Sequence, residues 1–180
     1  MDDNASVEPT HSALIVPIPE AEPVVARHRD RLDRAASWGV PAHVTVLFPF
    51  LPPASLEPRV LDALARLTAT VPAFFLTLTD IAWFGDRVVW LKPDPAAPFR
   101  QLTAAVTGRY PQCRPYEGQF ADVIPHLTLG HDHPQPVLQA AAAEVRPRLP
   151  IHARVSTLRL IIGRREPGAL WTTHAEFPLG

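Results

Sequence analysis

Two stretches of the chain alternate polar and apolar residues in the way that is typical of a half-buried β-strand. They read GVPAHVTVLFPF over residues 39–50 and IPHLTLG over residues 124–130. Successive side chains on a strand point to opposite faces, so a histidine and the threonine two positions later share one face and aliphatic residues fill the other. The polar faces of the two predicted strands carry His43 with Thr45 and His126 with Thr128.

The rest of the pattern predicts strands and helices in alternation, in an α+β fold. Runs rich in branched and aromatic residues predict strands over 12–18, 74–79, 87–92, 152–164 and 169–179, with a turn at residues 85–86. Apolar residues at helical spacing predict helices over 22–39, 56–67, 97–110 and 136–149, the second with Ser55 as its N-cap. The two histidines stand roughly 80 residues apart, so we expect two similar half-domains that each hold one copy of the motif.

Length and composition favour one globular domain. A chain of 180 residues, 47% of them hydrophobic, suits a single domain over residues 11–180 after a flexible N-terminus at residues 1–10. No apolar run approaches the roughly 18 residues that a membrane helix needs, and the acidic start lacks the pattern of a signal peptide. We therefore expect a cytoplasmic protein without membrane contact. The single cysteine, Cys113, excludes an internal disulfide and a thiolate-rich metal site.

Charge narrows the range of partners. The formal net charge is −1, which gives no general basic field of the kind that holds long nucleic acids. A nucleotide ligand would have to be held by local contacts. We therefore expect a small nucleotide or an RNA terminus as the partner, and the sequence indicates no obligate protein partner.

The residue types of the two motifs suit the chemistry of a phosphate ester. Histidine has an ordinary pKa of about 6.5, so one imidazole can accept a proton and another can donate one near neutral pH. Displacement at phosphorus needs a base for the attacking oxygen and an acid for the leaving oxygen. Threonine hydroxyls can donate hydrogen bonds to the remaining phosphate oxygens. This chemistry requires no metal and no cofactor.

Two copies of the motif are much stronger evidence for a functional site than one copy. A single histidine on a strand is more often a hydrogen-bonded core residue than a catalyst, and threonine is a common strand residue. The order histidine, aliphatic, threonine, aliphatic is expected by chance at roughly 0.04 places in a chain of this composition. Two chance copies would then be roughly a one-in-a-thousand event.

With HVTV at residues 43–46 and HLTL at residues 126–129, the sequence resembles the two-histidine phosphoesterase superfamily. Bacterial members are described as 2′-5′ RNA ligase-like or RNA 2′,3′-cyclic phosphodiesterases. The opening ALIVPIPE, the middle FGDRVVWL and the loop RPYEGQFADVIPHLTLG extend the resemblance over nearly the whole chain. It implies a bilobal α+β fold, in which two antiparallel sheets with flanking helices are related by a pseudo-twofold axis and enclose an active-site groove.

The resemblance also implies roles for the motif residues. Members open a 2′,3′-cyclic phosphate or a related phosphodiester of a nucleotide without a metal. By analogy His126 activates water, His43 protonates the leaving ribose oxygen, and the roles are exchangeable on sequence grounds. Thr45 and Thr128 would hold the phosphate. Tyr116, Trp83 and Phe84 are further candidates for substrate binding, since aromatic faces stack on bases.

Other functions remain open at this stage. In a metal-dependent hydrolase, His131 and His133 would join His126, although GHDHPQP also has the composition of a turn. A non-catalytic binder of a nucleotide or phosphate could use the same fold, and strand joining through a 2′-5′ linkage is the reverse of the same chemistry. The remaining histidines carry no motif and are expected to be surface or packing residues: His11, His28, His152 and His174.

Overall fold

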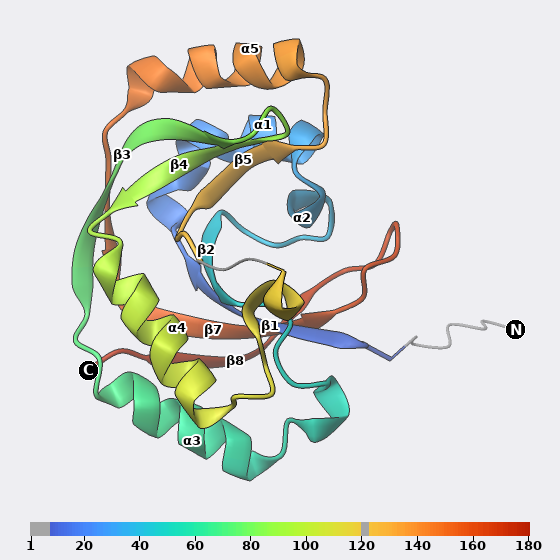
Figure 1. The fold of residues 1–180 in the computed structure, drawn as a ribbon, viewed down its shortest axis with the longest axis vertical. Helices are drawn as coiled ribbons and strands as arrows, with labels where there is room; N and C mark the ends of the chain where they lie inside the picture. Colours follow the sequence, from blue (N-terminus) through green and yellow to red (C-terminus); the bar gives the residue numbers. More distant parts are fainter. Residues whose placement is uncertain (1–7, 120–122) are drawn as a thin grey trace, which may run out of the picture.

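A computed structural model describes residues 8–119 and 123–180. The strands are β1 (His11–Pro17), β2 (His43–Leu47), β3 (Phe74–Phe84), β4 (Val88–Asp94), β5 (Leu127–His131), β6 (Ile151–Val155), β7 (Thr157–Gly163) and β8 (Thr172–Pro178). The helices are α1 (Glu22–Leu32), α2 (Arg34–Ser37), α3 (Pro58–Ala69), α4 (Ala97–Arg109) and α5 (Gln135–Val145). The predicted α+β class is confirmed (Figure 1).

The strands form two antiparallel four-stranded sheets within the described residues. The first sheet has the order β2-β1-β7-β8 and the second β5-β4-β3-β6. In each sheet the strand with the histidine motif lies at one edge, and the two edge strands β2 and β5 contact each other. The sheets therefore meet along the strands that carry or directly follow the two histidines, as the predicted bilobal fold requires.

One predicted strand, over 152–164, is in fact two strands that belong to different sheets. β6 pairs with β3 in the second sheet, whereas β7 pairs with β1 in the first. Only Ser156 separates them, and the buried positions shift phase there, from Ala153 and Val155 to Leu158 and Leu160. The first sheet thus combines strands from both ends of the chain, so the two sheets do not correspond to the first and second halves of the sequence.

The predicted helix over 22–39 is also interrupted. Asp33 has extended backbone angles, and its side chain accepts a hydrogen bond from the Ala35 backbone N–H at 3.0 Å. It thereby caps α2 and ends α1, because the backbone at this residue leaves the helical conformation. After the break the Asp33 carboxylate lies 3.8 Å from Nδ1 of His131 in β5.

Two further predicted boundaries differ from the structure. Ser55 is not a helix N-cap: it lies in a short 3-10 turn, and α3 begins at Pro58 with Glu57 as its N-cap. Proline is favoured in the first turn because its fixed φ fits the helix and the N–H it lacks has no partner there. The strand predicted over 74–79 continues to Phe84, past a register shift between Leu78 and Asp80.

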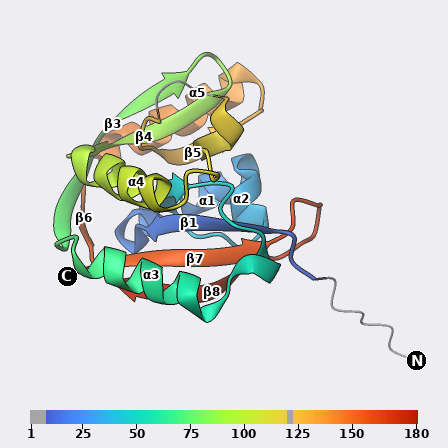
Figure 2. The same ribbon diagram turned by 60° about the horizontal axis from the view of Figure 1, so that its bottom comes forward.

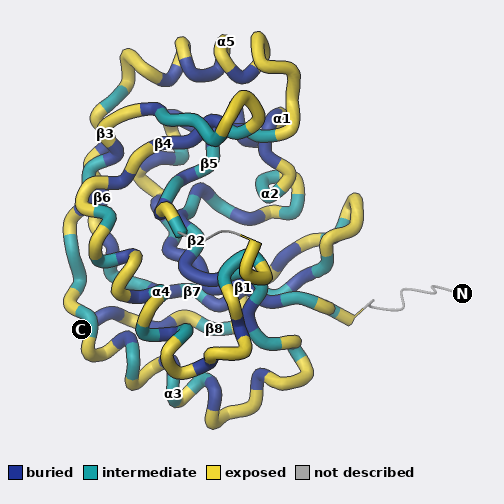
Figure 3. The backbone as a smooth tube through the Cα atoms, viewed as in Figure 1, coloured by how far each residue is buried: buried dark blue, intermediate teal, exposed yellow. Residues whose placement is uncertain are grey.

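Helices pack against both sheets, and α1 and α4 lie between the levels of the two sheets in Figure 2. α1 and α5 contact strands of the second sheet, while α4 contacts β2 and α3 contacts β8 in the first (Figure 2). The face of α5 that turns toward the sheet is buried, and its outer face is exposed (Figure 3). One continuous apolar core joins both sheets, and it includes the aliphatic residues of both motifs: Val44, Val46, Leu127 and Leu129.

The predicted flexible N-terminus falls mostly on residues 1–7, which lie outside the described residues. Thr10 already belongs to the folded part, since its backbone N–H donates to the Gly163 carbonyl at 3.0 Å. No helix in the described ranges is long and apolar enough to cross a membrane.

Candidate active site

The two motif histidines make the same local hydrogen bond. His43 Nδ1 lies 2.7 Å from the Pro41 carbonyl oxygen, and His126 Nδ1 lies 2.7 Å from the Ile124 carbonyl oxygen. A carbonyl oxygen only accepts, so Nδ1 carries the proton in each ring and donates it. The neutral form of each imidazole then keeps its lone pair on Nε2, which fixes the atom that can exchange protons with a ligand.

Both histidines and both threonines line one groove of about 540 Å³ between the sheets. We call it the central groove. Along each motif the exposure alternates in the same way, with the histidine and threonine half-buried and the aliphatic residues buried. The predicted grouping of His43, Thr45, His126 and Thr128 around one space is therefore present in the structure.

Burial sets the charge of the two histidines. The pKa of His43 is lowered from 6.5 to about 4, chiefly because burial disfavours the imidazolium and next because of the Arg29 guanidinium. The pKa of His126 is lowered as well, mainly by burial, against the opposing effects of its hydrogen bond to Ile124 and the charge of Asp33. Both imidazoles are therefore neutral at pH 7 in the free protein, and a bound phosphate anion would favour protonation.

Two aromatic rings pack beside His126. The Phe84 ring meets the imidazole edge to face at a centroid distance of 5.0 Å, and the Trp90 ring lies 5.8 Å away. Phe84 also lines the central groove, as predicted for a substrate-binding residue. Trp83 does not reach it: as the neighbouring strand residue it faces the other way and lines a separate hollow with residues of α5.

Tyr116 reaches the groove from the loop after α4. Its backbone N–H donates to the Phe48 carbonyl oxygen at 2.7 Å, and its side chain hydrogen-bonds to Thr45. Burial raises the pKa of the phenol. Tyr116 and Glu117 have φ values of 49° and 58°, a left-handed conformation that costs free energy in residues other than glycine. The strained backbone therefore lies where the loop brings Tyr116 to Thr45.

A buried ion pair that sequence reasoning missed lies behind the histidines. Arg29 and Asp33 are 2% and 5% exposed, and Arg29 donates two hydrogen bonds to Asp33 Oδ2 at 3.0 and 2.9 Å. The Asp33 charge opposes the lowering of the pKa of both His43 and His126. An acidic residue within an otherwise helical pattern was the only sequence signal for this arrangement.

His131 also lines the central groove, with its Nδ1 3.8 Å from Asp33 Oδ1. His133 is exposed on the loop that follows β5, as the turn-like composition indicated. Among the described residues, no three His, Cys, Asp or Glu side chains are grouped so that they could hold a metal ion. The alternative metal site of His126, His131 and His133 is therefore not assembled in the structure.

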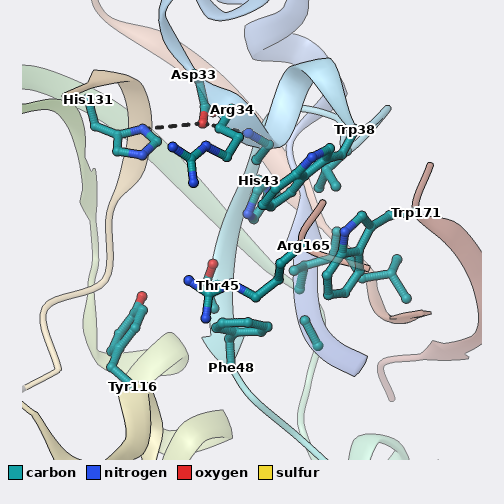
Figure 4. Close-up of a pocket in the computed structure, with 15 residues that line it drawn as sticks. Asp33, Arg34, Trp38, His43, Thr45, Phe48, Tyr116, His131, Arg165 and Trp171 are labelled. Carbon is teal, nitrogen blue, oxygen red and sulfur yellow. Dashed lines mark hydrogen bonds and ion pairs between the residues drawn. The ribbon is translucent and has the colours of Figure 1, made fainter. Parts of the chain in front are cut away.

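A second hollow of about 230 Å³ adjoins the central groove on the His43 side. Its wall includes the rings of Trp38, Trp171 and Phe48, and we call it the aromatic hollow (Figure 4). The Trp38 and Trp171 rings stack at a centroid distance of 6.2 Å. Trp38 directly follows α2, Phe48 directly follows β2 and Trp171 directly precedes β8, so the fold brings the three rings together.

An antiparallel two-sheet fold with a histidine and a threonine from each sheet in one groove defines the class of two-histidine phosphoesterases. The family model of the 2′-5′ RNA ligase superfamily matches residues 15–167, and the chain belongs to this superfamily. A search of curated proteins finds no match.

Solved structures agree on the fold. Escherichia coli LigT in complex with 3′-AMP is 19% identical, with a TM-score of 0.64 over 96% of this chain and 99% of the other. LigT in complex with NADP+ is 22% identical, with a TM-score of 0.59 over 96% and 99%. The protein TT0787 of Thermus thermophilus is 21% identical, with a TM-score of 0.65 over 94% and 97%. At these identities the likeness concerns the fold alone.

Proposed function

We propose that the protein is a metal-independent phosphodiesterase that opens a 2′,3′-cyclic phosphate of a nucleotide or of an RNA terminus. The observation that carries the proposal is the matched pair of imidazoles, each with Nδ1 bound to a backbone carbonyl, on one groove with a threonine beside each. Membership of a superfamily of phosphoesterases agrees with this chemistry. The structures of LigT with 3′-AMP and NADP+ support a nucleotide as the ligand.

In the proposed reaction His126 acts as the base and His43 as the acid. The neutral Nε2 of His126 takes a proton from water as its oxygen bonds to phosphorus. His43, protonated once the anionic phosphate is bound, gives its proton to the ribose oxygen as the bond from that oxygen to phosphorus breaks. One water is consumed, one monophosphate forms, and proton exchange with solvent restores both rings.

The surroundings of the histidines favour this assignment of roles. The aromatic hollow is lined by His43 and not by His126, so a nucleoside seated there would place its ribose oxygen beside His43. Thr45 and Thr128 lie on the same groove, where their hydroxyls could donate to the non-bridging phosphate oxygens. Tyr116 and Phe84 would line the substrate, while Trp83 would not take part.

The test is incubation with 2′,3′-cyclic AMP, CMP, GMP and UMP, and with an RNA that ends in a cyclic phosphate, in the presence of a chelator. Identification of the monophosphate isomer shows which bond is cut. We expect turnover that the chelator does not change. Turnover that stops with chelator and returns with zinc would support the metal alternative, and binding without turnover would support a non-catalytic binder. The expected cytoplasmic location and the absence of an obligate partner stay predictions.

A further inference from the structure

Two arginines line the aromatic hollow without an ion pair to a carboxylate of the described residues. Arg34 in α2 and Arg165 in the β7–β8 loop both line the aromatic hollow; the Arg165 guanidinium extends toward Thr45, and that of Arg34 extends toward His131 (Figure 4). No carboxylate in the described part of the chain lies within ion-pair distance of either one.

Absence of an ion pair does not by itself single these two arginines out. Within the described residues, ion pairs hold Arg27, Arg29, Arg59, Arg87, Arg146, Arg159 and Arg164, and the remaining arginines form none. What distinguishes Arg34 and Arg165 among the unpaired arginines is that they line a cavity. The acidic residues next to Arg34 and Arg165 in the sequence form ion pairs with other arginines. Asp33, beside Arg34, pairs with Arg29, and Glu166, beside Arg165, pairs with Arg164. Two arginines without an ion pair thus line a single cavity, which the paired Asp33 also lines, and Arg34 has Asp132 as a more distant charged neighbour.

The elements that carry the two arginines are fixed to each other. The Trp171 backbone N–H donates to the Trp38 carbonyl oxygen at 2.8 Å, and its indole Nε1 donates to the Arg164 carbonyl oxygen at 2.8 Å. The Arg165 guanidinium lies 5.7 Å from the centroid of the Phe48 ring, at a distance typical of a cation–π contact. These contacts hold the Arg165 guanidinium against the wall of the hollow and tie the residue after α2 to the residue before β8.

A guanidinium group offers a planar fork of donors that matches the oxygens of a phosphate. In the proposed function the reacting phosphate occupies the central groove, which both histidines line. We propose that Arg34 and Arg165 form a second anion subsite, which binds a further phosphate on the nucleoside whose ribose lies beside His43. The preferred substrate then carries a 5′-phosphate group in addition to its 2′,3′-cyclic phosphate. This inference rests on the proposed function for its account of which group occupies the central groove.

The added phosphate can come from two sources, a free 5′-monophosphate or the 5′-phosphodiester of an RNA 3′ end. The test therefore compares kcat/KM for three substrates: 2′,3′-cyclic AMP with a 5′-hydroxyl, the same nucleotide with a 5′-phosphate, and the dinucleotide ApA with a 2′,3′-cyclic end. The wild-type protein should prefer the substrates with the extra phosphate by roughly tenfold at low ionic strength, and the preference should shrink in salt. A larger gain from the monoester identifies a free nucleotide, and a larger gain from the diester identifies an RNA end.

Single substitutions test whether Arg34 and Arg165 cause the preference for substrates with the extra phosphate. Arg34→Gln and Arg165→Gln should each reduce it by about threefold or more and leave kcat/KM for the 5′-hydroxyl substrate within about twofold of wild type. The control is Arg66→Gln on the exposed face of α3, which should change neither value. Equal losses on all three substrates would place the arginines at the reacting phosphate and overturn the inference, as would a wild-type protein without preference.

A binding measurement separates this inference from the proposed function. By calorimetry, adenosine 3′,5′-bisphosphate should bind more tightly than 3′-AMP, and the difference should fall in Arg34→Gln and Arg165→Gln. If no cyclic substrate is turned over but this difference is found, the proposed function fails and the subsite stands. If cyclic substrates are turned over but the difference is absent, the proposed function stands and the subsite fails.

Discussion

His43 and His126 stand on different sheets and make one and the same hydrogen bond, from Nδ1 to the carbonyl oxygen two residues earlier, at 2.7 Å in each. This bond selects the tautomer with its lone pair on Nε2 in both rings. Both histidines have the same tautomer in the free protein. The bound substrate therefore has to make one of them the acid and the other the base. The hollow beside His43 offers a physical origin for that difference.

The lowered pKa of His43 predicts that stability falls on acidification. An unfolded chain binds a proton on this residue below about pH 6.5, whereas the folded protein resists it until about pH 4, so the unfolding free energy should drop across that range. The contribution of His43 is on the order of 3 kcal/mol. Urea unfolding from pH 7.5 to 4 should show a shallower pH dependence in His43→Gln than in the wild type. Identical slopes would contradict the shift.

Because Arg29 and Asp33 form a buried ion pair, we expect removal of one charge to destabilise the protein more than removal of both. Asp33→Asn keeps an oxygen to cap α2 but leaves the Arg29 charge buried without its partner, which should cost about 3 kcal/mol or more. It should also lower the pKa of His43 and His126 further, because the Asp33 charge favours their protonation. Chemical denaturation and NMR titration of the imidazoles measure the two effects.

The matched control for this prediction removes both charges. Arg29→Met combined with Asp33→Asn should be more stable than Asp33→Asn alone, since no uncompensated charge remains. A double variant that is no more stable than the single one would mean that the cost comes from lost packing.

Phe84 and Trp83 offer a paired test of what sets the pKa of His126. Phe84→Leu removes the ring that lies 5.0 Å from the imidazole, so water should reach His126 and its pKa should rise toward the ordinary value. Trp83→Leu changes the adjacent residue on the other face and should leave this pKa unchanged while lowering stability, because Trp83 packs against the core. Equal pKa shifts in the two variants would show that general loosening is responsible. NMR titration of His126 decides between them.

The Trp171 indole leaves no room for a side chain at Gly163, the last residue before the β7–β8 loop. A Cβ at this position would lie 2.4 Å from Trp171 Cγ, so Gly163→Ala should displace the indole and cost about 1–3 kcal/mol. A Cβ added at Gly108, in α4, would meet no atom within 4 Å, and Gly108→Ala should instead stabilise by about 0.5–1 kcal/mol. Thermal melts of both variants provide the measurement. A Gly163→Ala protein as stable as wild type would show that Trp171 is not confined.

Local pattern was enough to predict the two motif strands. Alternation alone placed His43 with Thr45 and His126 with Thr128 on polar faces, and the structure buries the aliphatic residues between them. The same reasoning failed at residues 152–164, because both β6 and β7 alternate and only a phase shift of one residue at Ser156 marks the passage from one sheet to the other.

The walls of the site depend on tertiary contacts and were not predictable from local pattern. Trp171 and Arg165 lie far in the sequence from both motif strands, and Trp38, although close to His43 in sequence, precedes the alternating pattern, so no periodicity relates the three. Asp33 looked like one more polar residue of a helix until its extended backbone and its buried partner were visible. Trp83 and Phe84 were indistinguishable as candidates, because the face of the strand decides which one meets the groove.

The most direct test of the central claim is the turnover of 2′,3′-cyclic AMP by His43→Ala and His126→Ala, in chelator and beside the wild type. Each substitution should lower kcat by roughly 10²–10⁴ while the product still binds. His174→Ala, at an exposed position on β8, serves as the control and should keep wild-type activity. If either motif variant retains wild-type kcat, paired acid and base catalysis by these two histidines is wrong.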